Sequence, residues 1–139
     1  MRFAIPSIFA ALTLCAHGAV AQDMGSAAGE REYMMACASC HGADAKGNGP
    51  LADLLNVETP DLTMLTERAG GSFPFRNTLM LIDGRNEVRA HGGEMPVWGD
   101  RYTAMAYAED PEAGAPDTPD MVAQGRMLAL VTYLESIQQ

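Results

Sequence analysis

The sequence has few basic residues, no convincing strand pattern and no long apolar run beyond its first 21 residues. Nine Lys and Arg stand against 18 Asp and Glu, which gives a formal net charge of −9 at pH 7. Such an acidic chain is unsuited to nucleic acid, whose phosphates bind to basic surfaces. It favours docking to basic patches on other proteins instead. Without period-2 alternation, the predicted fold class is all-α.

The N-terminal stretch has the composition of a secretory signal. Arg2 precedes an apolar run, and residues 19–21 are small residues at the spacing that a signal peptidase recognises. Pro6 breaks the run and His17 adds polarity, so an uncleaved membrane anchor is the weaker alternative. We therefore predict a signal peptide over residues 1–21, a flexible lead-in over 22–28 and one domain over 29–139. Cleavage would make the net charge −10, because the signal carries one arginine and no acidic residue.

Cysteine is scarce, and its spacing is informative. The chain has three cysteines, and Cys15 would leave with the signal. A disulfide between Cys37 and Cys40 would close a tiny ring and stabilise little. A thioredoxin-like redox pair needs a βαβ context, which is absent here. A zinc site needs about four ligands, and the predicted mature chain offers only these two thiols, His41 and distant His91. The C-x-x-C-H pattern is instead the signature of covalent attachment of c-type haem.

The spacing of this motif has a geometric reason. Near the end of a helix, residues three apart project from the same side. Both thiols can therefore bond to the two vinyl groups of one porphyrin, and His41 then offers a ring nitrogen to the iron. The predicted cofactor is one haem c, attached through Cys37 and Cys40. Attachment of this kind requires an exported chain, which agrees with the predicted signal.

The helix-forming segments are short and are separated by long loops, which make sense if the loops wrap a large group that is not protein. In the last segment, Thr118, Pro119 and Asp120 form a strong start signal. Its pattern places Met121, Leu128, Val131, Leu134 and Ile137 near one face. Helices are expected over about 28–40, 61–70, 74–84 and 118–138, with a helical turn after residue 102.

At this point the sequence resembles the class I cytochromes c. The likeness covers nearly the whole predicted mature chain, from GEREYMMACASCHG through GNGP and GGEMPVWG to LALVTYLESIQ. It implies the cytochrome c fold, with about four or five short helices and long loops wrapped around one covalently bound haem. It also implies a monohaem cytochrome that carries single electrons between redox proteins outside the cytoplasm, and not an enzyme.

The resemblance assigns roles to particular residues. His41 would be the proximal ligand of the iron and Met95 the distal one. Pro50 would offer its carbonyl to the outer nitrogen of His41, which fixes the ring. Trp98 would pack against the haem, with its N–H free to meet a propionate. Gly29 and Tyr33 would cross the last helix near Leu130 and Tyr133.

Other candidates compete for some of these roles. Met95 lies in a glycine-rich loop beside Pro96, far along the chain from His41, whereas most other methionines follow helical patterns typical of core packing. His91 is the competing distal ligand, and Met64 and Met105 are weaker candidates. The methionines interpreted as core are Met34, Met35, Met80, Met121 and Met127. Any of five arginines could neutralise a propionate: Arg68, Arg76, Arg85, Arg89 and Arg101.

Two other functions remain open at this level. The chain could be the haem subunit of a larger dehydrogenase or oxidase complex, or a haem enzyme or gas-binding protein with an open distal position. The expected partners are redox proteins with basic docking surfaces, such as a dehydrogenase, an oxidase or another cytochrome. Neither nucleic acid nor a membrane span of the mature chain is expected. The predicted location is outside the cytoplasm, in a bacterial periplasm.

Overall fold

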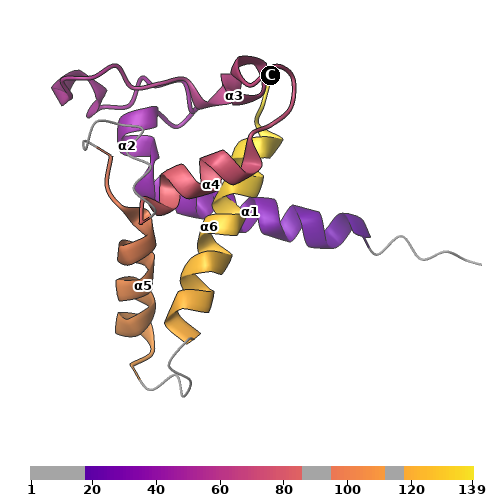
Figure 1. Ribbon diagram of the computed structural model, residues 1–139, viewed down its shortest axis with the longest axis vertical. Helices are drawn as coiled ribbons and strands as arrows, with labels where there is room; N and C mark the ends of the chain where they lie inside the picture. Colours follow the sequence, from indigo (N-terminus) through magenta and orange to yellow (C-terminus); the bar gives the residue numbers. More distant parts are fainter. Residues whose placement is uncertain (1–17, 86–94, 112–117) are drawn as a thin grey trace, which may run out of the picture.

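The computed structural model describes residues 18–85, 95–111 and 118–139, and within them every regular element is helical (Figure 1). The described chain thus confirms the all-α prediction, with six α-helices of which two are single turns, and two 3-10 helices. In chain order the elements are α1 (Gly18–Ala36), α2 (Ala38–His41), η1 (Ala52–Leu54), η2 (Leu62–Met64), α3 (Leu65–Arg68), α4 (Phe75–Asp83), α5 (Trp98–Glu109) and α6 (Thr118–Ser136).

The frame of the fold is the crossing of α1 and α6, the most extensive helix–helix contact in the described chain (Figure 1). A Cβ added at Gly29 would collide with the carbonyl oxygen of Ala129 and lie 2.7 Å from the Cβ of Tyr133. The ring of Tyr33, one helical turn further on, is centred 5.4 Å from that of Tyr133. Only glycine permits so close an approach, which agrees with the crossing expected from the sequence.

Helix α6 begins at Thr118 as predicted, but its buried face differs from the prediction. Val131 and Leu134 are buried, whereas Met121 and Leu128 are 71% and 45% exposed. Helices α1, α4 and α5 all pack against α6. Buried residues therefore occur on more than one face of α6. The buried positions of α6 are Pro119, Ala123, Met127, Leu130, Val131 and Leu134.

The first helix is longer at its start and shorter at its end than the sequence suggested. It begins at Gly18, so residues 22–28, which were predicted as a flexible lead-in, are helical in this structure. Alanine, glutamine and methionine in this stretch are good helix formers, and adding turns to an existing helix is cheap. The helix ends at Ala36, and α2 follows after a break at Cys37.

Local signals explain the ends of the shorter elements. Gly84 ends α4 in the left-handed region, with φ of 69°, and its N–H donates to the carbonyl of Met80. The side chain of Asp61 caps η2 by accepting from the backbone N–H of Thr63 at 2.8 Å. Helix α5 is longer than predicted. Only a helical turn after residue 102 was expected, whereas the helix begins at Trp98.

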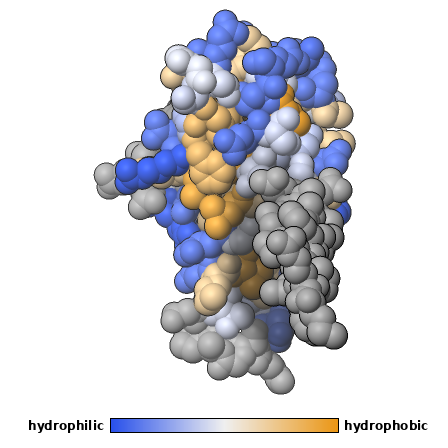
Figure 2. Space-filling view, turned by 90° about the vertical axis from the view of Figure 1, so that its right-hand side faces the viewer, coloured by the Kyte–Doolittle hydropathy of each residue, from blue (hydrophilic) through white to orange (hydrophobic). Residues whose placement is uncertain are grey.

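Apolar residues are exposed on part of the surface. On the face shown in Figure 2, they gather in a band down the middle, with hydrophilic residues above it and to its left. Met34, Met35 and Met121, which were interpreted as core, are 48%, 71% and 71% exposed, whereas Met127 is buried. Among the residues described, no helix has both the length and the hydrophobicity that crossing a membrane requires.

Candidate functional site

The site begins with the turn that carries the two thiols and the histidine. The N–H of His41 donates to the carbonyl of Cys37 at 2.9 Å, and so does that of Cys40 at 3.1 Å, which holds all three residues in one helical turn. Cys37 and His41 are each 8% exposed, and Cys40 is half-buried. Both cysteines are free thiols in the structure. The motif is therefore presented on a short rigid helix and not on a loose loop.

The loop after α2 is hydrogen-bonded to this turn. Gly47 donates its N–H to the carbonyl of His41 at 2.8 Å, and Gly49 donates to that of Cys40 at 3.0 Å. These bonds satisfy carbonyls that the end of a short helix leaves unpaired. A Cβ at Gly49 would lie 2.5 Å from the carbonyl oxygen of Ser39, so the loop can approach only because this residue is glycine.

His41 is oriented by a carbonyl, but not by the one that the resemblance implied. Its Nδ1 lies 3.2 Å from the carbonyl oxygen of Pro60. A carbonyl oxygen can only accept, so Nδ1 of His41 carries the proton in this contact. Pro50, which was predicted to play this role, is exposed, and its neighbours Gly49 and Leu51 donate their N–H groups to carbonyls of α2.

Several hydrogen bonds hold the segment after Pro60 and so fix the position of the Pro60 carbonyl. The carboxylate of Asp61 accepts from both the N–H and the hydroxyl of Thr63, at 2.8 and 2.7 Å. These bonds hold the pKa of Asp61 below its usual value. The side-chain amide of Gln138 donates to the carbonyl of Leu62 at 2.8 Å, which ties this segment to the end of α6.

Two adjoining cavities lie beside the turn. They enclose about 510 and 540 Å³ of space, open mouths included, and both are lined by Cys37, His41, Pro60 and Met95. Most of the other lining side chains are apolar. Those of the first cavity include Leu55, Val57 and Trp98, and those of the second include Leu62, Leu65 and Leu134. An apolar space with a histidine and a methionine along its walls suits a large, flat, metal-bearing ligand.

The structure brings together five of the six residues predicted for the site. Cys37, Cys40, His41, Met95 and Trp98 all line the first cavity, although the last two come from a segment far along the chain. Trp98 opens α5, and its ring is centred 5.7 Å from that of Tyr102. The guanidinium carbon of Arg101 lies 5.3 Å from the centre of the Trp98 ring, at cation–π distance.

A model of the cytochrome c family matches residues 26–138, which includes the turn, Pro60 and the Met95 segment. The chain belongs to the cytochrome c family. Membership implies covalently bound haem c and a role in electron transfer, and the spacing of Cys37 and Cys40 is that of the attachment motif. Searches of curated proteins and of solved structures returned no match.

The residues of this cytochrome fit the group that the family binds. Cys37 and Cys40 would supply the two attachment points and His41 one metal donor, beside an apolar cavity that all three line. The hydroxyl of Thr59, on the wall of the first cavity, is buried and has no hydrogen-bond partner within the described part of the chain. A buried polar group left open toward a cavity suits a site whose remaining partner belongs to a bound ligand.

The buried position of Cys37 affects the ionisation of its thiol. Burial, together with the neighbouring charges of Cys40 and Glu32, raises the pKa of the Cys37 thiol to about 12. The thiol therefore stays neutral at physiological pH, which lowers the cost of keeping it in an apolar cavity.

Within the described ranges, His, Cys, Asp and Glu do not gather in groups of three or more that could hold a metal ion.

The remaining candidates lie elsewhere. Met64 and Met105 line neither cavity, and Met105 is 42% exposed on α5. His91 and Arg89 fall outside the described residues. Arg68 donates to the carbonyl of Asp61. Pro60 and the apolar walls from η2, α3 and α4 were not predicted from the sequence. No local signal distinguishes Pro60 from Pro50, because the choice depends on the path of the whole loop.

Proposed function

We propose that the protein is a monohaem c-type cytochrome that carries single electrons between redox proteins outside the cytoplasm, with His41 and Met95 as the axial ligands of its iron. The observation that supports this most is the shared wall of the two cavities: a histidine anchored at Nδ1 and a methionine from a separate segment line the same space as Cys37. Haem c supplies the one-electron iron couple when it is bound.

The chain's own residues favour electron transfer over ligand activation. The hydrogen bond from His41 to the carbonyl of Pro60 fixes the imidazole plane and raises its basicity. A thioether from Met95 is a soft, neutral donor, which favours ferrous iron and raises the potential relative to a second imidazole. If His41 and Met95 both held the iron, no position would remain open for oxygen or peroxide, which suits electron transfer.

The surface near the cavity mouth supports docking to basic proteins. Glu58 lines the first cavity, and the exposed side chains of Leu54 and Val57 lie in the same loop region. The chain as a whole carries a net charge of −9. We expect a partner that presents basic residues around an apolar patch, with an association rate that falls as salt screens the attraction. Export through the predicted signal, to a periplasm, completes the proposal.

Replacement of Met95 by alanine tests the proposal. In the ferric holoprotein, the Met95→Ala variant should lose the weak long-wavelength band of thioether-ligated haem, and its midpoint potential should fall because a neutral soft donor is removed. Met105→Ala is the matched control, since Met105 is exposed on α5 and lines neither cavity. A Met95→Ala protein with the wild-type spectrum and potential would exclude Met95 as the ligand. High-spin bands in the wild type would indicate an open distal position.

A further inference from the structure

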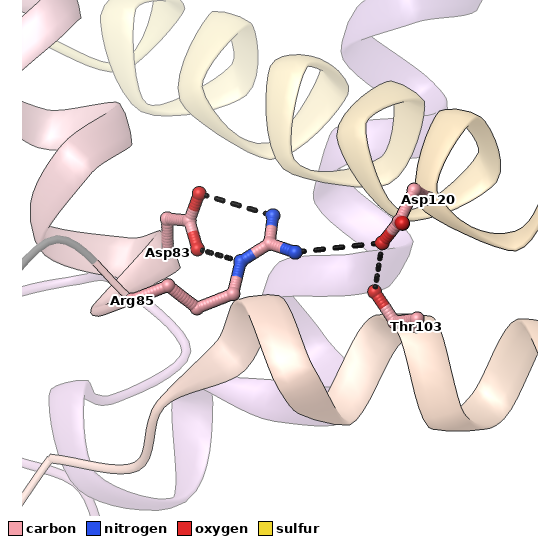
Figure 3. A network of polar contacts seen from close by, with 4 residues as sticks. All are labelled: Asp83, Arg85, Thr103 and Asp120. Atoms are coloured by element: carbon pink, nitrogen blue, oxygen red, sulfur yellow. Dashed lines mark hydrogen bonds and ion pairs between the residues drawn. The ribbon is translucent and has the colours of Figure 1, made fainter. Parts of the chain in front are cut away.

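A polar network joins α4, α5 and α6 (Figure 3). The guanidinium of Arg85 grips the carboxylate of Asp83, at the end of α4, through Nε at 2.5 Å and Nη2 at 3.2 Å. Its Nη1 reaches Oδ1 of Asp120, in the first turn of α6, at 3.4 Å. The hydroxyl of Thr103 on α5 donates to the same Oδ1 at 3.0 Å. One arginine thus links α4 and α6, and Asp120 adds α5.

The start of α5 packs directly against this network. A Cβ at Gly99 would collide with the carboxylate of Asp83 and lie 2.5 Å from Nε of Arg85. A Cβ at Gly84 would lie 3.3 Å from the Cα of Val97. The residues two and four positions after Met95 therefore rest on the end of α4 and on Arg85. The packing at this point fixes where the backbone leaves the Met95 segment.

The charges make Arg85 the central member of the network. Asp83 lies at the C-terminal end of α4, where the helix dipole disfavours a carboxylate, and its side chain is only 17% exposed. Asp120 lies at the N-terminal end of α6, where the dipole favours it. Asp100 adds a third negative charge nearby. Without Arg85 these carboxylates would repel one another across the contact between α4, α5 and α6.

We infer that Arg85 is a positioning residue for Met95, because it clamps α4, α5 and α6 at the base of the Met95 segment and so determines how firmly the thioether is held in the cavity. This inference rests on the proposed role of Met95 as the distal ligand. The contribution is modest, since the Arg85 side chain is 31% exposed and its ion pairs are partly screened. Loss of the clamp should raise the population with the thioether displaced by about three- to fivefold.

Competition with exogenous imidazole measures this population. In the ferric holoprotein, imidazole binds only where the thioether has left, so its apparent affinity reports how often Met95 is displaced. Arg85→Gln should bind imidazole about three to five times more tightly than the wild type. Arg76→Gln, which removes the same charge from an exposed position on α4, should bind imidazole as the wild type does. Arg85→Lys keeps the charge without the planar fork and should fall between the two.

The possible outcomes distinguish the inference from the proposed function. A wild-type protein without the long-wavelength band, or a Met95→Ala protein that binds imidazole no better than the wild type, would overturn the ligand assignment and the inference with it. A normal wild-type band with equal imidazole affinities for Arg85→Gln and Arg76→Gln would overturn the inference alone. If Arg85→Gln does not accumulate as holoprotein, Thr103→Val, which removes one bond of the network, should raise imidazole affinity about twofold, and no rise would overturn the inference.

Discussion

The crossing of α1 and α6 can be tested by replacing two helical glycines with alanine. The two substitutions should change the free energy of unfolding in opposite directions. Gly→Ala inside a helix gains about 1 kcal/mol from helix propensity alone. At Gly29 the new Cβ would collide with the carbonyl oxygen of Ala129 and lie 2.7 Å from the Cβ of Tyr133. Backbone atoms cannot rotate away, so the helices would have to separate, at a cost of about 3 kcal/mol. The net expectation for Gly29→Ala is a loss of about 2 kcal/mol.

Gly125→Ala is the matched control on α6. A Cβ there meets no atom within 4 Å, so only propensity acts and the free energy of unfolding should rise by about 0.5–1 kcal/mol. The assay is guanidinium unfolding of the two ferric holoproteins and the wild type, followed by far-UV circular dichroism. The two variants should differ by about 2.5–3 kcal/mol. Equal stabilities for Gly29→Ala and Gly125→Ala would show that the helices do not approach as described.

Three further variants test the thiols and the segment that orients His41. Cys37→Ala and Cys40→Ala should each weaken covalent haem retention, so that acid–acetone extracts more haem than from the wild type, and equal extraction would contradict the attachment. The pKa of Asp61 is lowered by its bonds to Thr63, so the stabilisation is complete above the unfolded pKa of about 3.9 and is lost as pH falls below it. Thermal melting of Asp61→Asn should therefore lie below the wild type at pH 7 and converge with it in acid, and a constant difference across this range would refute the linkage.

Elements with strong local signals could be predicted from the sequence. Pro74 and Gly84 bracket α4, and Thr118 with Pro119 and Asp120 begins α6, because each of these residues has a backbone or capping preference of its own. Helix α5 was missed. Its buried positions are Gly99, Tyr102 and Ala106, and the small residues among them give a weak hydrophobic period although they pack tightly.

The residues of the site were likewise predicted where the pattern is local and missed where it depends on the path of the chain. The attachment motif is local, and Cys37, Cys40 and His41 share one turn that any helix would give them. The carbonyl that faces His41 belongs to Pro60 and not to Pro50, and this depends on how the intervening loop folds back on α2. The buried face of α6 depends likewise on which helices pack around it, which the periodicity of one segment does not contain.

The most direct test of the account is the intact mass and visible spectrum of the protein purified from a host that matures c-type cytochromes. We expect a red protein whose mass exceeds that of its polypeptide by one haem, retained after denaturation because Cys37 and Cys40 would both bond to it. A colourless product with the mass of the bare polypeptide, from a host that attaches haem to a control cytochrome, would contradict it.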